Sequence, residues 1–123
     1  ASTLADGLPT GEAVAVPGFD LPAMWVILTV GPIFSQHPDG GPELLADCYR
    51  NCLDVAESLG ASSVAFPSIS TGVYGWPARP AARIAVSAVR AWADDQPGSR
   101  VAEVHMVAFS PESLEPLEAA LRA

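Results

Sequence analysis

The stretch SSVAFPSISTGVYGWP, residues 62–77, decides the fold class of this chain. Its first part, residues 62–68, is a short and mostly apolar run that predicts a buried β-strand. A polar segment with two glycines follows, and the stretch ends at Pro77, where an amphipathic pattern begins. Since proline is tolerated in the first turn of a helix, the stretch predicts a strand, a tight loop and a helix in direct succession.

Further strands are predicted on both sides of this stretch. The apolar, β-branched run MWVILTV at 24–30 predicts a strand covered on both faces. Weak alternation at 12–16 predicts a short strand that ends at Pro17 and Gly18. The run VAEVHMVAF at 101–109 predicts another strong strand near the end of the chain.

Three segments carry helical features. Apolar residues recur every three or four positions between residues 42 and 59, where Gly60 closes the pattern, and again between residues 77 and 92. The third segment is 111–123, with Pro116 inside it. Strands thus alternate with helices from residue 24 onward, which predicts an α/β layered sheet with helices on both faces. The apolar positions of the first two helices are Leu45, Cys48, Cys52, Val55 and Leu59, and Ala81, Ala85, Ala88, Val89 and Trp92.

Length and composition restrict the function. A chain of 123 residues, half of them hydrophobic, suits a single domain that covers residues 1–123. It has 14 acidic and 6 basic residues and no lysine, so it lacks the basic stripe that duplex nucleic acid requires. The apolar run 21–34 is interrupted by proline and glycine and falls short of the ~20 residues of a membrane helix, and no secretory leader is visible. We therefore expect a cytoplasmic protein whose partners are neither nucleic acid nor membranes.

The two cysteines, Cys48 and Cys52, lie four residues apart in the helical pattern. This spacing fits two reduced thiols in the core better than a disulfide framework. The only histidines, His37 and His105, are far from them in sequence, so neither a metal site nor a cofactor is expected.

The loop from Ser70 to Gly75 is the candidate binding site, because α/β sheets bind ligands where a strand ends and a helix begins. Its glycines allow main-chain N–H groups to converge on an anion, the helix dipole adds positive potential, and Ser70 and Thr71 add hydroxyl donors. Tyr74 has an apolar face and a hydroxyl that suit a sugar or a base edge. The same residues also suit a plain strand-to-helix turn with Tyr74 and Trp76 packing on its outside.

Other nucleotide-binding and hydrolase motifs are excluded. A P-loop needs a lysine that this chain does not have, and no Gly-x-Gly-x-x-Gly occurs. Ser70 does not lie in a Gly-x-Ser-x-Gly nucleophile elbow. Neutral amide donors are therefore the plausible means by which so acidic a protein holds phosphates.

Three runs together resemble the macro domain family, in particular its bacterial branch of O-acetyl-ADP-ribose deacetylases and ADP-ribosyl-glutamate/aspartate hydrolases. The resemblance covers nearly the whole chain. The runs are LPTGEAVAVPGFDLPAMWVILTVGP at 8–32, LLADCYRNCLDVA at 44–56 and the opening stretch at 62–77.

The resemblance implies a three-layer α/β/α sandwich with a mixed sheet and with ADP-ribose in a cleft on top of it. It implies that the loop amides wrap the diphosphate and that the aromatic position of the loop lies near the distal ribose. The residues that it assigns to the ligand are Ser70, Thr71, Gly72, Val73, Tyr74 and Gly75. It places Phe109 on the adenine side, although Phe109 equally suits an ordinary core position at the end of a strand.

The chain also departs from the family pattern. Macro domains ordinarily begin with two further strands and a helix, and these carry an Asn-Ala-Asn-like stretch and a glycine-rich loop with an acidic residue implicated in hydrolysis. None of these motifs occurs here, and Leu28 stands where this branch usually has histidine. We therefore expect an N-terminally truncated macro domain that keeps one wall of the cleft, with an exposed sheet edge that favours pairing with another chain.

No catalytic residue is assigned. Three acidic residues, Asp47, Asp54 and Glu57, lie on or near the solvated side of their helix, and His105 suits a structural role in a strand. Two functions remain open: an ADP-ribose-binding module of the ADP-ribosyl ester hydrolase type, and a non-catalytic reader or degenerate interaction domain.

Overall fold

The computed structural model describes residues 9–17, 25–33, 40–67, 69, 75–108 and 111–122. The predicted strands and helices occur in the predicted order. They are β1 (Ala13–Pro17), β2 (Trp25–Thr29), α2 (Gly41–Ser58), β3 (Ser63–Phe66), α3 (Ala78–Asp95), β4 (Glu103–Met106) and α4 (Pro111–Arg122).

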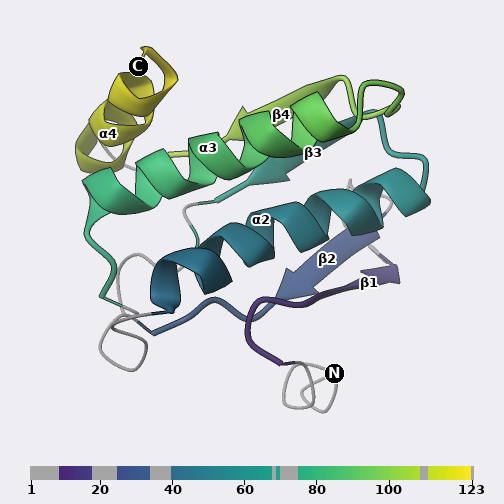
Figure 1. Cartoon of the computed structure of the whole chain (residues 1–123), viewed down its shortest axis with the longest axis horizontal. Helices are drawn as coiled ribbons and strands as arrows, with labels where there is room; N and C mark the ends of the chain where they lie inside the picture. Colours follow the sequence, from purple (N-terminus) through teal and green to yellow (C-terminus); the bar gives the residue numbers. More distant parts are fainter. Residues whose placement is uncertain are drawn as a thin grey trace.

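The strands form two sheets of two strands each in the described part of the chain. Strand β1 is antiparallel to β2, with Ala13 opposite Thr29 and Pro17 opposite Trp25. Strand β3 is parallel to β4, with Phe66 opposite Met106. Strands β2, β3 and β4 point in the same direction, so their carboxyl ends lie at one end of the molecule (Figure 1).

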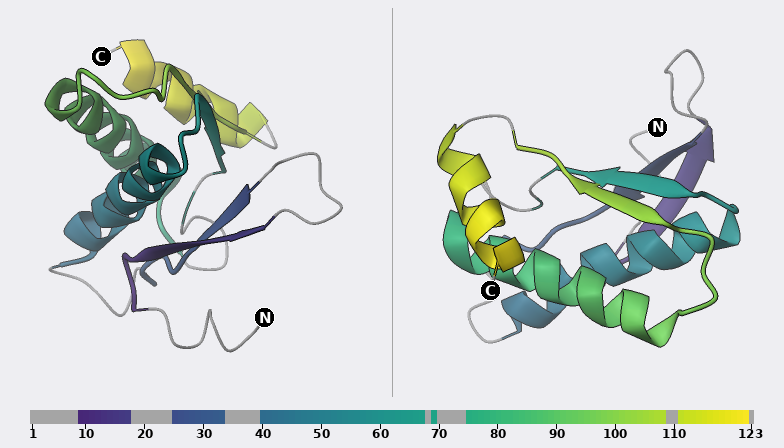
Figure 2. Two further views of the ribbon diagram at one scale, coloured as in Figure 1. Left: turned by 90° about the vertical axis from the view of Figure 1, so that its right-hand side faces the viewer. Right: turned by 90° about the horizontal axis from the view of Figure 1, so that it is seen from above.

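Helices α2 and α3 lie side by side on one face of the strands, and α4 packs against α3 (Figures 1 and 2). Helix α2 ends where predicted, because Gly60 has a φ of +75°, a left-handed conformation that stops the helix. Of the helices that the structure describes, none combines the length and the apolar character that crossing a membrane requires.

The main core lies between this helix layer and the strands. Side chains of β3 and β4 alternate: Val64 and Met106 pack toward the helices, while Ala65 and His105 are exposed on the other face. The described helices therefore cover one face of this sheet. The buried residues of the main core are Leu45, Tyr49, Cys52, Leu53, Phe66, Trp76, Ala81, Ala85, Ala88 and Trp92, and a smaller cluster of Ala82, Val86, Leu117 and Ala120 joins α3 to α4.

Candidate functional site

The carboxyl ends of β2, β3 and β4 and the first residues of α2 and α3 lie at the same end of the molecule (Figure 1). We call this end the carboxyl edge. Three connecting segments begin there: residues 30–40 after β2, residues 67–77 after β3 and residues 107–110 after β4. Ligands of α/β sheets bind at such an edge, so the candidate loop leaves its strand where a binding site is expected.

Most of the predicted ligand contacts lie outside the described residues. These are Ser70, Thr71, Gly72, Val73 and Tyr74 of the loop, and Phe109 after β4. The structure describes both flanks of the loop, namely residues 66, 67 and 69 before it and residues 75–77 after it. Gly75 has a φ of +83°, a left-handed conformation that residues with a side chain rarely adopt.

The first flank is held by a buried tyrosine of α2. The Tyr49 side chain is 2% exposed, and its ring centroid lies 4.9 Å from that of Phe66, with the two ring planes tilted by 56°. The main-chain N–H of Ile69 donates a hydrogen bond to the Tyr49 hydroxyl at 3.2 Å. Burial raises the pKa of Tyr49 to about 12, so the hydroxyl is neutral at physiological pH. A neutral side chain in the core thus fixes the position of the loop three residues after β3.

The second flank is held by a buried tryptophan. Trp76 is 5% exposed, and its Nε1 donates a hydrogen bond to the carbonyl of Pro32 at 3.0 Å. Pro32 follows β2 and is itself fully buried. This bond therefore ties the loop after β3 to the segment after β2, and Trp76 lies in the core instead of on the outside of the turn.

Helix α3 begins directly after the second flank without a side-chain cap. Its N-cap residue is Pro77, with φ −60° and ψ 139°, and its first turn contains no acidic residue. Uncapped N–H groups in the first turn of an 18-residue helix carry a partial positive charge that favours anions. The loop thus ends at a helix terminus whose dipole is not neutralised by its own side chains.

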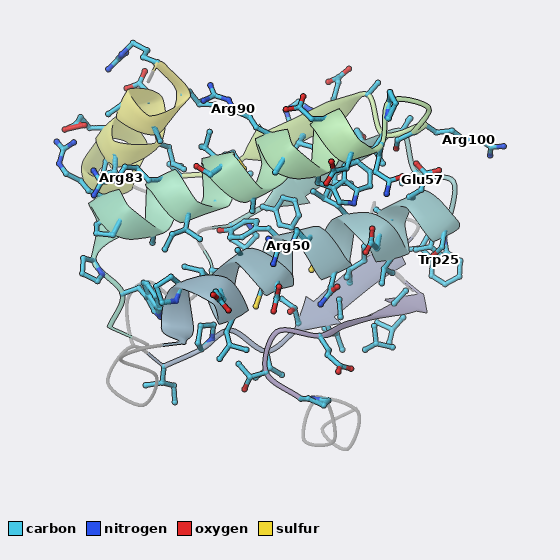
Figure 3. All side chains as sticks on the ribbon, in the orientation of Figure 1. Trp25, Arg50, Glu57, Arg83, Arg90 and Arg100 are labelled. Atoms are coloured by element: carbon cyan, nitrogen blue, oxygen red, sulfur yellow. The ribbon has the colours of Figure 1, made fainter. Side chains whose placement is uncertain are left out.

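Two arginines, one at the start of α3 and one on α2, form ion pairs with carboxylates. Arg79, at the start of α3, forms an ion pair with Glu115 of α4. Arg50 projects from the outer surface of α2 (Figure 3), where it pairs with Asp47. At the two flanks of the loop, the contacts described above are made by aromatic side chains and main-chain groups.

The acidic residues considered for catalysis have structural partners. Asp54 accepts a hydrogen bond from Trp92 Nε1 at 2.8 Å, which joins α2 to α3. Glu57 accepts hydrogen bonds from the Ser99 hydroxyl and the Arg100 N–H. These two side chains lie toward the solvated side of α2, as expected, and in addition have structural partners. Glu57 and Arg100 lie at the end of the molecule opposite the carboxyl edge (Figure 3).

The remaining candidates are two histidines and two cysteines. His105 is exposed on β4, where its Nε2 lies 3.0 Å from Glu103 Oε2, and His37 lies outside the described residues.

Cys48 and Cys52 are free, buried thiols, as the spacing predicts. Burial raises the pKa of both, to about 12 for Cys52, so both stay protonated and unreactive near neutral pH. Within the described ranges, no group of three or more His, Cys, Asp and Glu residues is placed to hold a metal ion.

Sequence reasoning missed the residues that hold the loop. Tyr49 was not counted among the apolar positions of α2, although it lies four residues after Leu45 and next to Cys48. Its location in LLADCYRNCLDVA placed it on the buried face by helical spacing. Its hydrogen bond to Ile69 has no sequence signal of its own, because the two residues are 20 positions apart.

The sequence of this chain matches a protein family and several of its members. The macro domain family profile matches residues 1–85. A macro domain-containing protein of Streptomyces nogalater is 58% identical over 90 residues, which are 73% of this chain and 49% of that protein. The macro domain-containing protein SCO6450 of Streptomyces coelicolor is 49% identical over 121 residues, which are 98% of this chain and 68% of that protein. The human ADP-ribose glycohydrolase MACROD2 is 48% identical over 88 residues, or 71% of this chain and 21% of that protein.

Solved structures show the same fold. A mutant of the Oceanobacillus iheyensis macrodomain with ADPR superposes with a TM-score of 0.88 at 41% identity, covering 98% of this chain and 64% of that one. The Trypanosoma brucei macrodomain in complex with ADP-ribose superposes with a TM-score of 0.82 at 34% identity, covering 92% of this chain and 46% of that one. The chain thus spans about half to two thirds of the length of its bacterial relatives. The predicted α/β fold class is confirmed, and the chain belongs to the macro domain family.

Proposed function

We propose that this chain binds ADP-ribose at the carboxyl edge, with residues 70–75 holding the diphosphate through main-chain N–H groups. The observation that carries the proposal is the pair of anchors on the glycine-containing loop, Tyr49 to Ile69 on one flank and Trp76 to Pro32 on the other. Anchors at both ends of a loop restrict the conformations available between them, which reduces the ordering cost of binding.

The chemistry of the flanks supports a phosphate ligand. Gly75 adopts a left-handed φ that lets the chain curl, and α3 begins without a side-chain cap. Both features favour an anion that is held by main-chain amides and by the helix dipole. Such a site needs no cationic side chain. Two structural relatives have been solved with ADPR or ADP-ribose and also with ADP, which supports a ligand that contains an adenosine diphosphate group.

For activity, we propose that the chain is of the ADP-ribosyl ester hydrolase type. The substrates of this type are O-acetyl-ADP-ribose and proteins with ADP-ribosylated glutamate or aspartate. The name of MACROD2, an ADP-ribose glycohydrolase, supports a hydrolase lineage. The alternative is a non-catalytic reader. It is favoured by the structural roles of Asp54 and Glu57, which have protein partners at positions away from the carboxyl edge.

Calorimetric titration of the chain with ADP-ribose tests the binding proposal. We expect saturable binding that falls in Gly75→Ala, because the positive φ disfavours a side chain at that position. Gly98→Ala is the matched control, since a Cβ there meets no atom within 4 Å. Equal affinity of Gly75→Ala, Gly98→Ala and the parent would show that the loop does not hold the ligand.

A turnover assay with O-acetyl-ADP-ribose then separates the enzyme from the reader. Release of acetate in step with the appearance of ADP-ribose supports ester hydrolysis. Binding with no acetate release above the buffer rate supports the reader.

A further inference from the structure

Acidic residues are distributed unevenly along this chain. All 14 of them lie outside residues 58–93, a stretch that contains β3, the candidate loop and nearly all of α3. Three of the six arginines lie inside this stretch, namely Arg79, Arg83 and Arg90 of α3. In a protein with a net charge of −8, the candidate loop is therefore followed directly by a basic segment.

Arg79 and Arg83 lie on the part of α3 that adjoins the candidate loop. Arg79 is in the first turn of α3, and Arg83 follows four residues later, so the two side chains are neighbours on the surface of the helix. Both are exposed, and Arg83 lies at the end of α3 near the carboxyl edge (Figure 3). At a rise of about 1.5 Å per residue, Arg83 is about 9 Å along the helix from Pro77, the residue before its first turn.

Both side chains are available to a ligand. Arg79 pairs with Glu115 of α4, but these side chains are 57% and 51% exposed, and so exposed an ion pair is weak enough for the carboxylate of a ligand to replace it. Among the residues that the structure describes, Arg83 has no hydrogen-bond or ion-pair partner. Arg90 differs from both, because it donates a hydrogen bond to the Leu121 carbonyl and holds α3 to α4. The contact with Glu115 also shows that this surface accepts a carboxylate.

The position of this arginine pair beside the loop indicates which part of a substrate it meets. In an ADP-ribosyl ester, a single ribose separates the diphosphate from the ester, so the acceptor emerges close to the groups that hold the phosphates. When residues 70–75 hold the diphosphate, the first turns of α3 are therefore neighbours of the acceptor. An acetyl group is small and uncharged and gives an arginine nothing to pair with. A polypeptide acceptor carries further side chains, and carboxylates among them complement guanidinium groups.

We propose that Arg79 and Arg83 bind carboxylates of an acidic polypeptide that carries the ADP-ribosyl group on glutamate or aspartate. The inference rests on the proposed function and adds the substrate class, namely a modified acidic protein in preference to O-acetyl-ADP-ribose. It is carried by charge complementarity, because a chain with a net charge of −8 repels an acidic polypeptide except where its arginines attract one. Since both arginines are exposed, the attraction weakens as the salt concentration rises.

Two short synthetic peptides test this preference. In each, the central residue is a glutamine that is ADP-ribosylated on its side-chain amide, which is a stable replacement for the glutamate ester. The flanking residues are glutamates in one peptide and glutamines in the other. Calorimetry measures the affinity of the whole chain for both peptides and for free ADP-ribose. We expect the glutamate peptide to bind about fivefold more tightly than the glutamine peptide, and this ratio to fall toward one between about 0.05 and 0.5 M NaCl.

Variants of the chain assign the preference to the two arginines. Arg79→Gln combined with Arg83→Gln should bring the ratio of the two affinities close to one, while Arg83→Lys alone should keep most of it, because the charge remains. Arg100→Gln is the matched control, since Arg100 is also exposed but lies at the opposite end of the molecule (Figure 3). It should keep the parental ratio. Circular dichroism confirms that each variant is folded.

Equal affinity of the parent for the two peptides overturns the inference, and so does a preference that survives the loss of both arginines. A preference that Arg100→Gln removes as well also overturns it, since the effect then follows net charge and not position. In each of these cases, binding of free ADP-ribose leaves the proposed function standing. Absence of ADP-ribose binding overturns both.

Discussion

The two ends of the molecule are held together by different chemistry. At the flanks of the candidate loop, two contacts join uncharged groups: Tyr49 with an amide, and Trp76 with a carbonyl. At the opposite end, the carboxylate of Glu57 accepts hydrogen bonds from the Ser99 hydroxyl and the Arg100 main-chain N–H, close to the turn that leads into β4. Uncharged contacts at the loop flanks add no negative charge beside a bound anion, which matters because like charges repel. We therefore expect the contacts at the opposite end to stabilise the fold only, and the contacts at the loop flanks to position a ligand as well.

The largest expected effect is that of Trp76→Ala. Removing a buried tryptophan destabilises a protein by about 3–5 kcal/mol, and this change also removes the bond to Pro32. We expect a loss of unfolding free energy of that size, measured in urea, together with weaker ADP-ribose binding by the folded protein. Trp92→Ala is the control, because Trp92 is equally buried and bonds to Asp54 instead. Equal affinities of the two folded variants would contradict a special role for the carboxyl edge.

The next effect is alkaline destabilisation of the core beneath the loop. Burial raises the pKa of Cys52 from 9.0 to about 12 and that of Tyr49 from 10.0 to about 12. Both groups therefore stay protonated when folded and ionise first in the unfolded chain. The contribution of Cys52 is complete below pH 9 and that of Tyr49 below pH 10, and each is lost as the pH rises from there toward 12, at up to about 1.4 kcal/mol per pH unit for each group.

Urea unfolding between pH 8 and 10.5 measures this loss. In Cys52→Ala the unfolding free energy should start lower but fall less steeply with pH, because one of the titrating groups is gone. Equal slopes for Cys52→Ala and the parent would show that this thiol is not buried as described.

A smaller and more specific effect is expected for Tyr49→Phe. The change keeps the ring on Phe66 but leaves the N–H of Ile69 without its acceptor, at a cost of about 1–2 kcal/mol. Because the loop is then less fixed, we expect ADP-ribose affinity to fall by about tenfold, equivalent to 1.4 kcal/mol. Calorimetry measures the affinity, and urea unfolding measures the stability. An unchanged affinity with reduced stability would make Tyr49 purely structural.

The smallest effect is expected at the opposite end, for Glu57→Gln. The amide oxygen still accepts a hydrogen bond, so only the charge contribution is lost, about 0.5–1 kcal/mol. ADP-ribose affinity should stay at the parental value in the same calorimetric assay. A clear drop in affinity would show that the two ends are coupled.

The elements of the fold were predictable because their signals are local. Residues 24–30, 62–68 and 101–109 each contain the strand predicted for them, although each strand is shorter than its apolar run. Helix α2 was predicted to within one residue at either end, since its apolar spacing and Gly60 mark its extent. The pairing of these strands was not predictable, because it depends on contacts between distant parts of the chain.

By itself, the sequence determined the order of strands and helices, the burial of both cysteines and the position of the candidate loop between β3 and α3. Each of these follows from patterns within a few neighbouring residues. Only the tertiary structure decided that Tyr49 holds Ile69, that Trp76 reaches Pro32 across 44 positions, and that β2 pairs with β1 while β3 pairs with β4. The physical reason is that hydrogen bonds and packing depend on distance in space, which a linear pattern does not encode for residues so far apart.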